Sequence, residues 1–492
     1  MDDEKGNEES QVAREVIDRY SLFTTAEKWC IIGMVAYAAW FSTLSSFIYF
    51  PALHLLSETF GVSVAKINLT ITSYMAIATI APTLVGDAAD VGGRRLVYVI
   101  TLSLYIGANI GIALSKSYHA LLGLRVLQAL AISGKLVPLI SLGTFSIAYG
   151  VVNDIASPAE RGSFVSAISF AITIAPSIGP ILGGVLTYAA DWTWIFWFLS
   201  IAAGIGLTTM IFLLPETSRN LVGNGSIRPA KYLRLPICGL MRHWNESDVT
   251  ENHKWRTPNP FKSLKILARK DNIGIIIACG FLYTVYTCLN VSLSILFIDI
   301  YKLNQWQAGL IYLPFGIGGT VSTFFSGPLL DTAYRNARTA RGLLTDKAVG
   351  DDLDNFPVEK ARLGVIWIPM LLTAASILTF GWVLHFHKHI AIPLCIQFIV
   401  GLCMQLDFSI YNTLLGDKNH RTPAAAQASS NIVRCTFAAI AISFLQGLID
   451  TIGIGWTFTI LSGMCLLAMS LFLLDYWKGT RWRQESLRRL TE

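Results

Sequence analysis

Charged residues are scarce in this sequence. Charged side chains make up 14% of its 492 residues, whereas soluble globular proteins carry roughly 25%. The sequence also has no Ser/His/Asp set, no cluster with metal-ligand spacing and no glycine-rich phosphate loop. These absences argue against a soluble enzyme. We therefore expect no enzymatic activity, no cofactor, no metal and no nucleic-acid partner.

Cysteines are few and follow no regular spacing. There are eight, without a CxxC pair, and most lie in apolar runs, as Cys279 and Cys403 do. We interpret them as small buried hydrophobic side chains, neither disulfide partners nor metal ligands. The N-terminus, MDDEKGNEES, is acidic and lacks the basic-then-apolar order of a cleaved signal peptide. The first apolar run is therefore expected to act as the targeting signal.

Long apolar runs account for the 53% hydrophobic content. With about 20 residues needed per bilayer crossing, we count about twelve candidate spans. Their limits are 29–50, 67–86, 96–115, 120–152, 163–188, 193–214, 273–298, 307–331, 363–386, 390–413, 425–449 and 455–477. The lengths favour helices, because a barrel would show short alternating strands. The sequence predicts an all-α polytopic membrane protein embedded in the lipid bilayer.

The distribution of Lys and Arg predicts the orientation of these spans. With both termini inside, the cytosolic segments contain Arg94, Arg95, Arg161, the 215–272 linker, Arg335, Arg338, Arg341, Lys418, Arg421 and the tail from Lys478 to Arg489. The outer loops then contain only Lys66, Lys116, Lys302 and Lys388. This asymmetry predicts cytosolic termini. Tryptophans near span ends predict an aromatic belt: Trp29, Trp192, Trp194, Trp306, Trp456 and Trp477.

A polar segment, 215–272, divides the chain into two halves of six spans. The expected organisation is a cytosolic tail (1–28), a six-helix bundle (29–214), a cytosolic linker (215–272), a second six-helix bundle (273–477) and a cytosolic tail (478–492). The linker shows no periodic pattern, so we expect it to be mostly disordered or loosely helical. Its end, Lys262 to Lys270, is expected to form a short basic helix on the membrane surface.

The fifth span contains the sequence GPILGG. Gly179 and Gly183 share one helical face, as do Pro180 and Gly184. Without bulky side chains, these faces allow close approach of another helix, and neighbouring helices can satisfy the backbone groups that a membrane proline frees. The GPxxGG arrangement resembles the helix-5 signature of proton-coupled exporters of the major facilitator superfamily. The alternative is a packing groove without a role in transport.

The loop after the second span resembles the cytosolic signature of the same superfamily, GxLaDrxGRR. The matching residues are Gly86, Asp90, Gly93, Arg94 and Arg95. The resemblance implies that Asp90 closes the cytosolic side by accepting hydrogen bonds and pairing with an Arg. Val91 stands where the family usually has Arg, so one charge contact is missing. An ordinary basic inner loop is the alternative.

Arg125 lies within the fourth span, where a charged side chain is costly unless it faces a polar interior. With Gln128 it resembles the family signature RxxQG, although Ala129 replaces the usual Gly. The resemblance implies proton coupling, because the fixed charge lowers the pKa of a nearby carboxylate. That carboxylate is not identified; Asp407 in the tenth span is the best intramembrane candidate. Snorkelling of Arg125 to the outer surface is the alternative.

Arg434 is a second intramembrane cation, in the sequence ASSNIVRC with Asn431. Together with YNTLLGD, which ends at Asp417, it resembles the fungal quinidine-resistance branch of drug:proton antiporters. Asp417 and Arg421 are then expected to be cytosolic gate charges. Arg434 either pairs with one of them near the inner face or snorkels to the surface. Asp331 closes the eighth span, in a segment that echoes the loop after the second span, and is included among the gate residues.

Weakly polar and aromatic side chains in several spans are candidates for the wall of a substrate cavity. They are Tyr37, Phe41, Tyr283, Tyr286, Asn290, Gln397, Gln405 and Asn431. Such walls suit amphipathic organic molecules without specifying one of them. For each residue taken alone, core packing or a helix-to-helix hydrogen bond is the alternative.

The apolar run 120–152 is too long for one crossing. Its 33 residues would extend about 50 Å as a helix, against about 30 Å of hydrocarbon. Compared with the family pattern, Lys135 to Phe145 are surplus. They form either a break or re-entrant kink, or a splicing artefact that would disable the chain.

These features together predict a major facilitator fold and a function in transport. The first hypothesis is a monomeric proton-coupled antiporter in the plasma membrane, exporting small amphipathic organic compounds by alternating access of its two halves. The second is an importer or facilitator of a small nutrient with the same fold. A membrane enzyme or receptor is a remote third, because no catalytic constellation or extramembrane domain is found.

Overall fold

The computed structural model describes residues 21–83, 93–133, 144–156, 161–227, 266–340, 356–419 and 423–491, whose regular elements are all helical. The first half comprises α2 (Thr25–Phe47), η1 (Phe50–Ala52), α3 (Leu53–Phe60), α4 (Val64–Thr83), α6 (Arg94–Ala113), α7 (Tyr118–Ser133), α8 (Thr144–Ile155), α9 (Arg161–Ala189) and α10 (Thr193–Leu213). After α11 (Arg219–Val222), the second half comprises α13 (Lys270–Tyr301), α14 (Gln305–Leu310), α15 (Leu313–Thr339), α16 (Val358–Leu363), α17 (Trp367–His385), α18 (Ala391–Lys418) and α19 (Pro423–Thr491).

Most of the predicted crossings correspond to long apolar helices. Within the described residues, nine helices are long and apolar enough to span a membrane. One of them, α19, is interrupted by non-helical backbone at Gly453 and covers two of the predicted spans. The predicted second and fourth spans correspond to α4 and to α7 with α8, which are not among the nine. The predicted all-α, polytopic fold is confirmed.

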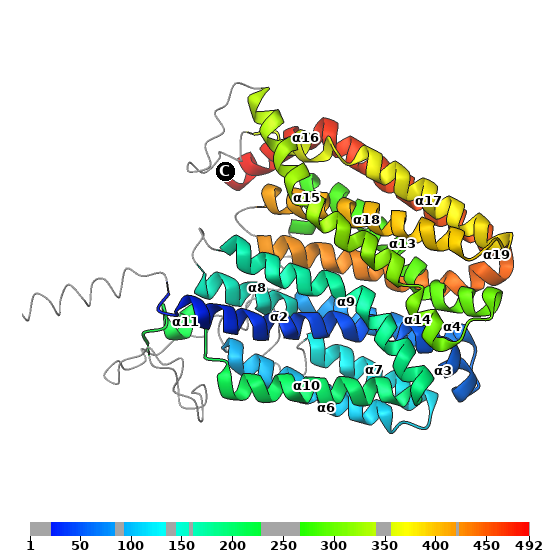
Figure 1. Ribbon diagram of the computed structural model, residues 1–492. Helices are drawn as coiled ribbons and strands as arrows, with labels where there is room; N and C mark the ends of the chain where they lie inside the picture. Colours follow the sequence, from blue (N-terminus) through cyan, green and yellow to red (C-terminus); the bar gives the residue numbers. More distant parts are fainter. Residues whose placement is uncertain are drawn as a thin grey trace, which may run out of the picture.

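The helices form two bundles that correspond to the two halves of the sequence (Figure 1). Within the first, α6 packs against α10 and α2 against α9; within the second, α13 and α17 pack against α19, and α15 against α18. Contacts between the bundles are made by α4 with α19 and by α9 with α14 and α15. The start of α2 and the end of α19 lie at the same end of the molecule, as an even number of crossings requires.

The glycines of the fifth span lie where the predicted close approaches occur. A Cβ at Gly183 would collide with the backbone oxygen of Ile48, at the end of the first span. A Cβ at Gly184 would come within 2.6 Å of the backbone oxygen of Gln305 in α14. One face of α9 therefore packs within its own half, and the adjacent face packs on the other half.

Within the fourth span, the structure describes two helices, α7 and α8. Residues 134–143, which include most of the surplus segment from Lys135 to Phe145, lie outside the described residues. The same is true of linker residues 228–265, and hence of four of the nine residues of the basic helix expected over 262–270.

Two details of the sequence prediction are wrong. Trp192, expected in the aromatic belt, is 4% exposed and packs against Phe60 and Phe196; the other five belt tryptophans are exposed. Cys30 and Cys395, expected to be buried, are exposed. In both cases the apolar run was correctly identified, but the face of the helix covered by neighbours is decided by packing.

Candidate functional site

Arg125 is at the centre of a buried polar network in the first half. Its side chain is only 1% exposed. Nη1 donates a hydrogen bond of 2.6 Å to Oε1 of Gln128, and Nε2 of Gln128 donates one of 2.7 Å to Oδ1 of Asn109 in α6. The two residues of the RxxQG resemblance are therefore hydrogen-bonded and buried in the structure, and their role in proton coupling stays a prediction.

The faces of two tyrosines cover the guanidinium of Arg125. Its central carbon lies 4.0 Å from the ring centroid of Tyr49 and 5.1 Å from that of Tyr74 in α4. Cation–π contacts of this kind partly compensate a desolvated cation. Among the described residues, no carboxylate forms an ion pair with Arg125.

Asp407 lies in the other half of the molecule and does not contact Arg125. It is fully buried in α18, and Oδ2 accepts a hydrogen bond of 3.1 Å from Oγ1 of Thr373 in α17. Its second oxygen has no hydrogen-bond partner among the residues that the structure describes. The structure therefore does not join the two residues that the sequence suggested for proton coupling into one site.

Arg434 is the intramembrane arginine of the second half and lies in the first part of α19. Its guanidinium lies 4.8 Å from the ring centroid of Tyr283, and Nη2 donates a hydrogen bond of 3.3 Å to Oδ1 of Asn431. Asp417, one of the two partners considered for Arg434, forms an ion pair of 2.9 Å with Arg362, and Arg421 lies outside the described residues. The guanidinium of Arg434 thus packs on an aromatic side chain of its own half.

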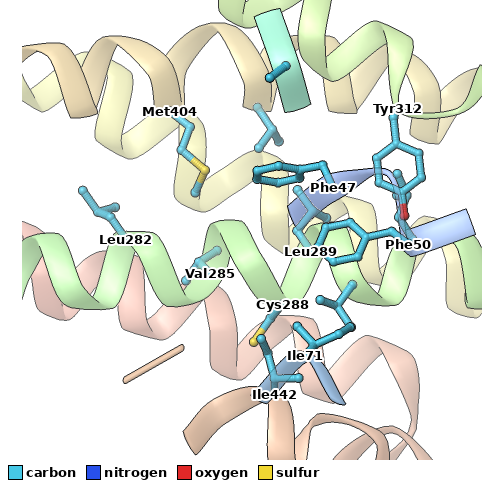
Figure 2. Close-up of a cluster of buried hydrophobic side chains, with 14 of the residues drawn as sticks. Phe47, Phe50, Ile71, Leu282, Val285, Cys288, Leu289, Tyr312, Met404 and Ile442 are labelled. Atoms are coloured by element: carbon cyan, nitrogen blue, oxygen red, sulfur yellow. The ribbon is translucent and has the colours of Figure 1, made fainter. Parts of the chain in front are cut away.

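An aromatic cluster adjoins Arg434 where the two halves meet. Tyr283 and Tyr286 of α13 pack with Phe408 of α18 at centroid distances of 6.3 and 6.0 Å. Tyr286 also contacts Phe47 of α2 at 6.0 Å, across the interface. Figure 2 shows the apolar core that continues from Phe47, with side chains from α4, α13, α18 and α19.

The other predicted cavity residues have different surroundings. Tyr37 donates to the backbone oxygen of Ala202 in α10, and Phe41 packs on Tyr105, so both contact their own half. Asn290 donates to a backbone oxygen of its own helix. Gln397 is fully buried, and within the described part of the chain neither of its side-chain polar atoms has a hydrogen-bond partner. Gln405 lies beside Gly319.

Gly93 is the N-cap of α6, and Arg94 and Arg95 are its first residues. Gly86 and Asp90 lie outside the described residues. Gly93 has a φ of 95°, a conformation that favours glycine. The backbone N–H groups of Arg94 and Arg95 donate to Glu216 over 2.8 and 3.2 Å. Nε of Arg94 also forms an ion pair of 3.1 Å with Asp154.

Glu216 is a residue that the sequence analysis missed. It follows the sixth span and caps the N-terminus of α6, more than 100 residues away in the sequence. Burial raises the pKa of its carboxyl, while backbone N–H donors act in the opposite direction. The only signal in the sequence was a lone acidic residue directly after a span.

A second charge cluster, also missed, lies in the second half and joins α16, α18 and α19. Nζ of Lys418 is 2.8 Å from Asp475, and Nε of Arg483 is 2.9 Å from Glu359. All four side chains are buried. Asp331, which was expected to act as a gate residue, is exposed on α15. The partners are far apart in the sequence, which explains why no local motif revealed them.

Comparison with known proteins agrees with this architecture. The family model "Major Facilitator Superfamily" matches residues 35–442. The chain is 31% identical to "Citrate exporter 1" of Aspergillus niger, over 96% of this chain and 90% of that protein. It is 29% identical to "Multidrug transporter AQR1" of Candida glabrata, over 99% of this chain and 83% of that protein.

A solved structure supports the fold independently of close sequence similarity. The bacterial homologue of the human lysosomal transporter Spinster, in an inward-facing and unoccupied conformation, superposes with a TM-score of 0.64 at 12% identity. The match covers 94% of this chain and 99% of that chain. At this identity the comparison supports the arrangement of the helices only.

Proposed function

The chain belongs to the major facilitator superfamily, and we propose that it exports small amphipathic organic compounds from the cell in exchange for protons. It is a multi-pass membrane transporter without an enzymatic role, related to fungal exporters. The observation that supports this proposal best is the buried network of Arg125. A fixed charge held by Gln128 beneath Tyr49 is costly inside a membrane and is retained where it serves transport.

Alternating access is the proposed mechanism. The two halves contact each other along α4 with α19 and along α9 with α14 and α15, so rocking about these seams would open the shared interface to one side at a time. The aromatic cluster of Tyr283, Tyr286 and Phe408 would provide a weakly polar surface for an amphipathic compound.

Asp407 is the proposed proton carrier. It is a buried carboxyl with a hydrogen bond from Thr373, and its other oxygen has no partner among the described residues. A group in such surroundings can hold a proton in one state of the cycle and release it when water enters. Because Arg125 lies in the other half, coupling between the two would pass through the movement of the halves.

The orientation and location are also proposals. The basic residues of the inner loops favour cytosolic termini, and the two described chain ends lie at the same end of the bundle. We place the protein in the plasma membrane as a monomer. The names of its relatives, a citrate exporter and a multidrug transporter, favour export over the second candidate function, import of a small nutrient.

The test is a substrate screen in a yeast strain depleted of its own pumps. Cells expressing the protein should accumulate less of a transported compound, and a proton uncoupler should restore accumulation. Arg125→Ala should abolish export while the protein remains in the membrane. Arg481→Ala, which removes an exposed cation from α19, is the matched control and should export normally. Wild-type export by the Arg125→Ala protein would exclude Arg125 from the mechanism.

A further inference from the structure

Within the described part of the chain, each half of the molecule contributes one intramembrane arginine that forms no ion pair with a carboxylate. We propose that Arg125 and Arg434 together bind the acidic group of the transported compound, so that the substrates are organic anions such as carboxylic acids. This inference rests on the proposed export function and specifies its substrate class.

Both arginines have unused hydrogen-bonding capacity. The Nε atoms of Arg125 and Arg434 are buried and have no hydrogen-bond partner among the described residues. Each guanidinium donates to an amide oxygen, from Gln128 and Asn431 respectively. A guanidinium has five N–H donors in a planar fork that matches a carboxylate. The remaining donors on the two residues are therefore of the kind that an acidic ligand requires.

Tyr74 lies on α4, the helix of the first half that packs along α19, which carries Arg434. Its ring lies 5.1 Å from the guanidinium of Arg125. Tyr283 carries the guanidinium of Arg434 over its ring. Both cations therefore border the same seam between α4 and α19, where Thr72 and Ser443 are 3.2 Å apart.

No described acidic side chain neutralises this region. Asp407 is bound to Thr373, and Asp417 to Arg362. In the first half, the described carboxylates lie at or beyond the ends of the helices: Glu27, Glu58, Asp154, Asp191 and Glu216. Two uncompensated cations in a membrane interior are costly. An anion that enters when the halves separate would supply the missing charge.

Contacts with the rings of Tyr49, Tyr74 and Tyr283 stabilise the two arginines when no substrate is bound. Their ring faces interact with the guanidinium groups of Arg125 and Arg434 in the closed interface. These contacts are weaker than a charge-assisted hydrogen bond to a carboxylate. A substrate acid can therefore displace them, and an apolar body attached to the acid would lie against Tyr286 and Phe408.

The first experiment compares the charge of transported compounds. In inside-out vesicles containing the full-length protein, uptake of citrate and benzoate is measured against uptake of the tetraphenylphosphonium cation. We expect the two anions to be transported.

Arg434→Gln should reduce their uptake by about tenfold to hundredfold, because a hydrogen bond to a charged group is lost. Arg434→Lys should retain part of it, and Arg481→Gln should have no effect. Transport of the cation alone, or anion uptake unchanged by Arg434→Gln, would overturn the proposal.

The second experiment measures the local charge without relying on transport. Cys435 lies one residue after Arg434, and it is kept while the other cysteines are replaced. An anionic methanethiosulfonate reagent should label it about tenfold faster than a cationic reagent of similar size, after each rate is normalised to that for a free thiol. Arg434→Gln should bring the ratio close to one. Equal rates in the protein that retains Arg434, or no labelling by either reagent, would contradict an anion site that opens to water.

The two proposals can fail separately. Export that ignores a proton uncoupler removes proton coupling but leaves the reagent ratio and the anion preference unchanged. A ratio near one removes the anion site but leaves proton-coupled export intact.

Discussion

At the scale of single residues, Glu216 shows how one carboxylate secures two distant elements. It accepts hydrogen bonds from the backbone of Arg94 and Arg95 at the start of α6 and from Thr217 and Ser218 beside it. A carboxylate at a helix N-terminus also interacts favourably with the helix dipole. Together these contacts fix the end of the sixth span against the start of the third.

Replacing Glu216 should therefore destabilise the first half. Glu216→Ala leaves several backbone N–H groups without an acceptor, which costs about 1–3 kcal/mol. The expected result is a lower thermal unfolding temperature of the purified protein in detergent. Glu485→Ala removes an exposed carboxylate from α19 and should leave that temperature unchanged. Equal behaviour of the two variants would show that the cap contributes nothing to stability.

The two intramembrane arginines differ in their partners from the basic residues at the helix ends. Arg125 and Arg434 are held by amides and aromatic rings, whereas the basic residues of the inner ends pair with acids, as Arg362 does with Asp417. The inner pairs have a structural explanation in their ion pairs. The interface arginines form no ion pair among the described residues, which is why we propose that they bind the substrate.

At the scale of elements, α9 makes close contacts with both halves of the molecule. Through Gly183 it packs on the end of the first span, and through Gly184 on α14 of the other half. Pro176 and Pro180 lie within the helix without interrupting it. Both close approaches need backbone without side chains, which accounts for the two glycines Gly183 and Gly184 of the GPxxGG sequence.

A methyl group on this helix should disturb the contact between the halves. Gly184→Ala places a Cβ within 2.6 Å of a backbone oxygen of α14, and overpacking of this kind costs about 1–3 kcal/mol. We expect reduced thermal stability and reduced export. Gly204→Ala is the matched control, because no described atom lies within 4 Å of its Cβ, and it should retain both. Normal export by Gly184→Ala would show that the α9–α14 contact is dispensable.

At the scale of the whole molecule, the interface between the halves is the part that the proposed alternating-access mechanism requires to change. Thr72 of α4 and Ser443 of α19 contribute a hydroxyl contact of 3.2 Å across it. In the alternating-access mechanism this contact has to break or shift in each cycle.

Linking the halves at this point should stop export. Thr72→Cys with Ser443→Cys, in a protein without other cysteines, should form a disulfide on oxidation, abolish export, and regain it on reduction. Ala374→Cys with Ser462→Cys joins α17 to α19 within one half, where a hydrogen bond of 2.7 Å exists, and should leave export unaffected. Export that continues while positions 72 and 443 are cross-linked would exclude relative movement at this seam.

The sequence by itself determined the class, the number of spans and the family of this protein. Apolar run length and the positions of Lys and Arg are local properties, and a bilayer converts them directly into spans and orientation. The same holds for Arg125 with Gln128 and for GPxxGG, whose residues are neighbours on one helix. These features could be predicted without knowing how the helices pack.

Only the tertiary structure decided which distant residues meet. It separated Asp407 from Arg125, turned Arg434 toward Tyr283, and placed Glu216 at the start of α6. These contacts join different helices, and they depend on the rotation of each helix about its axis. In a membrane, lipid and protein are equally apolar, so hydrophobic pattern says little about that rotation. It is decided by close contacts such as those of Gly183 and Gly184, which appear only when the helices are packed together.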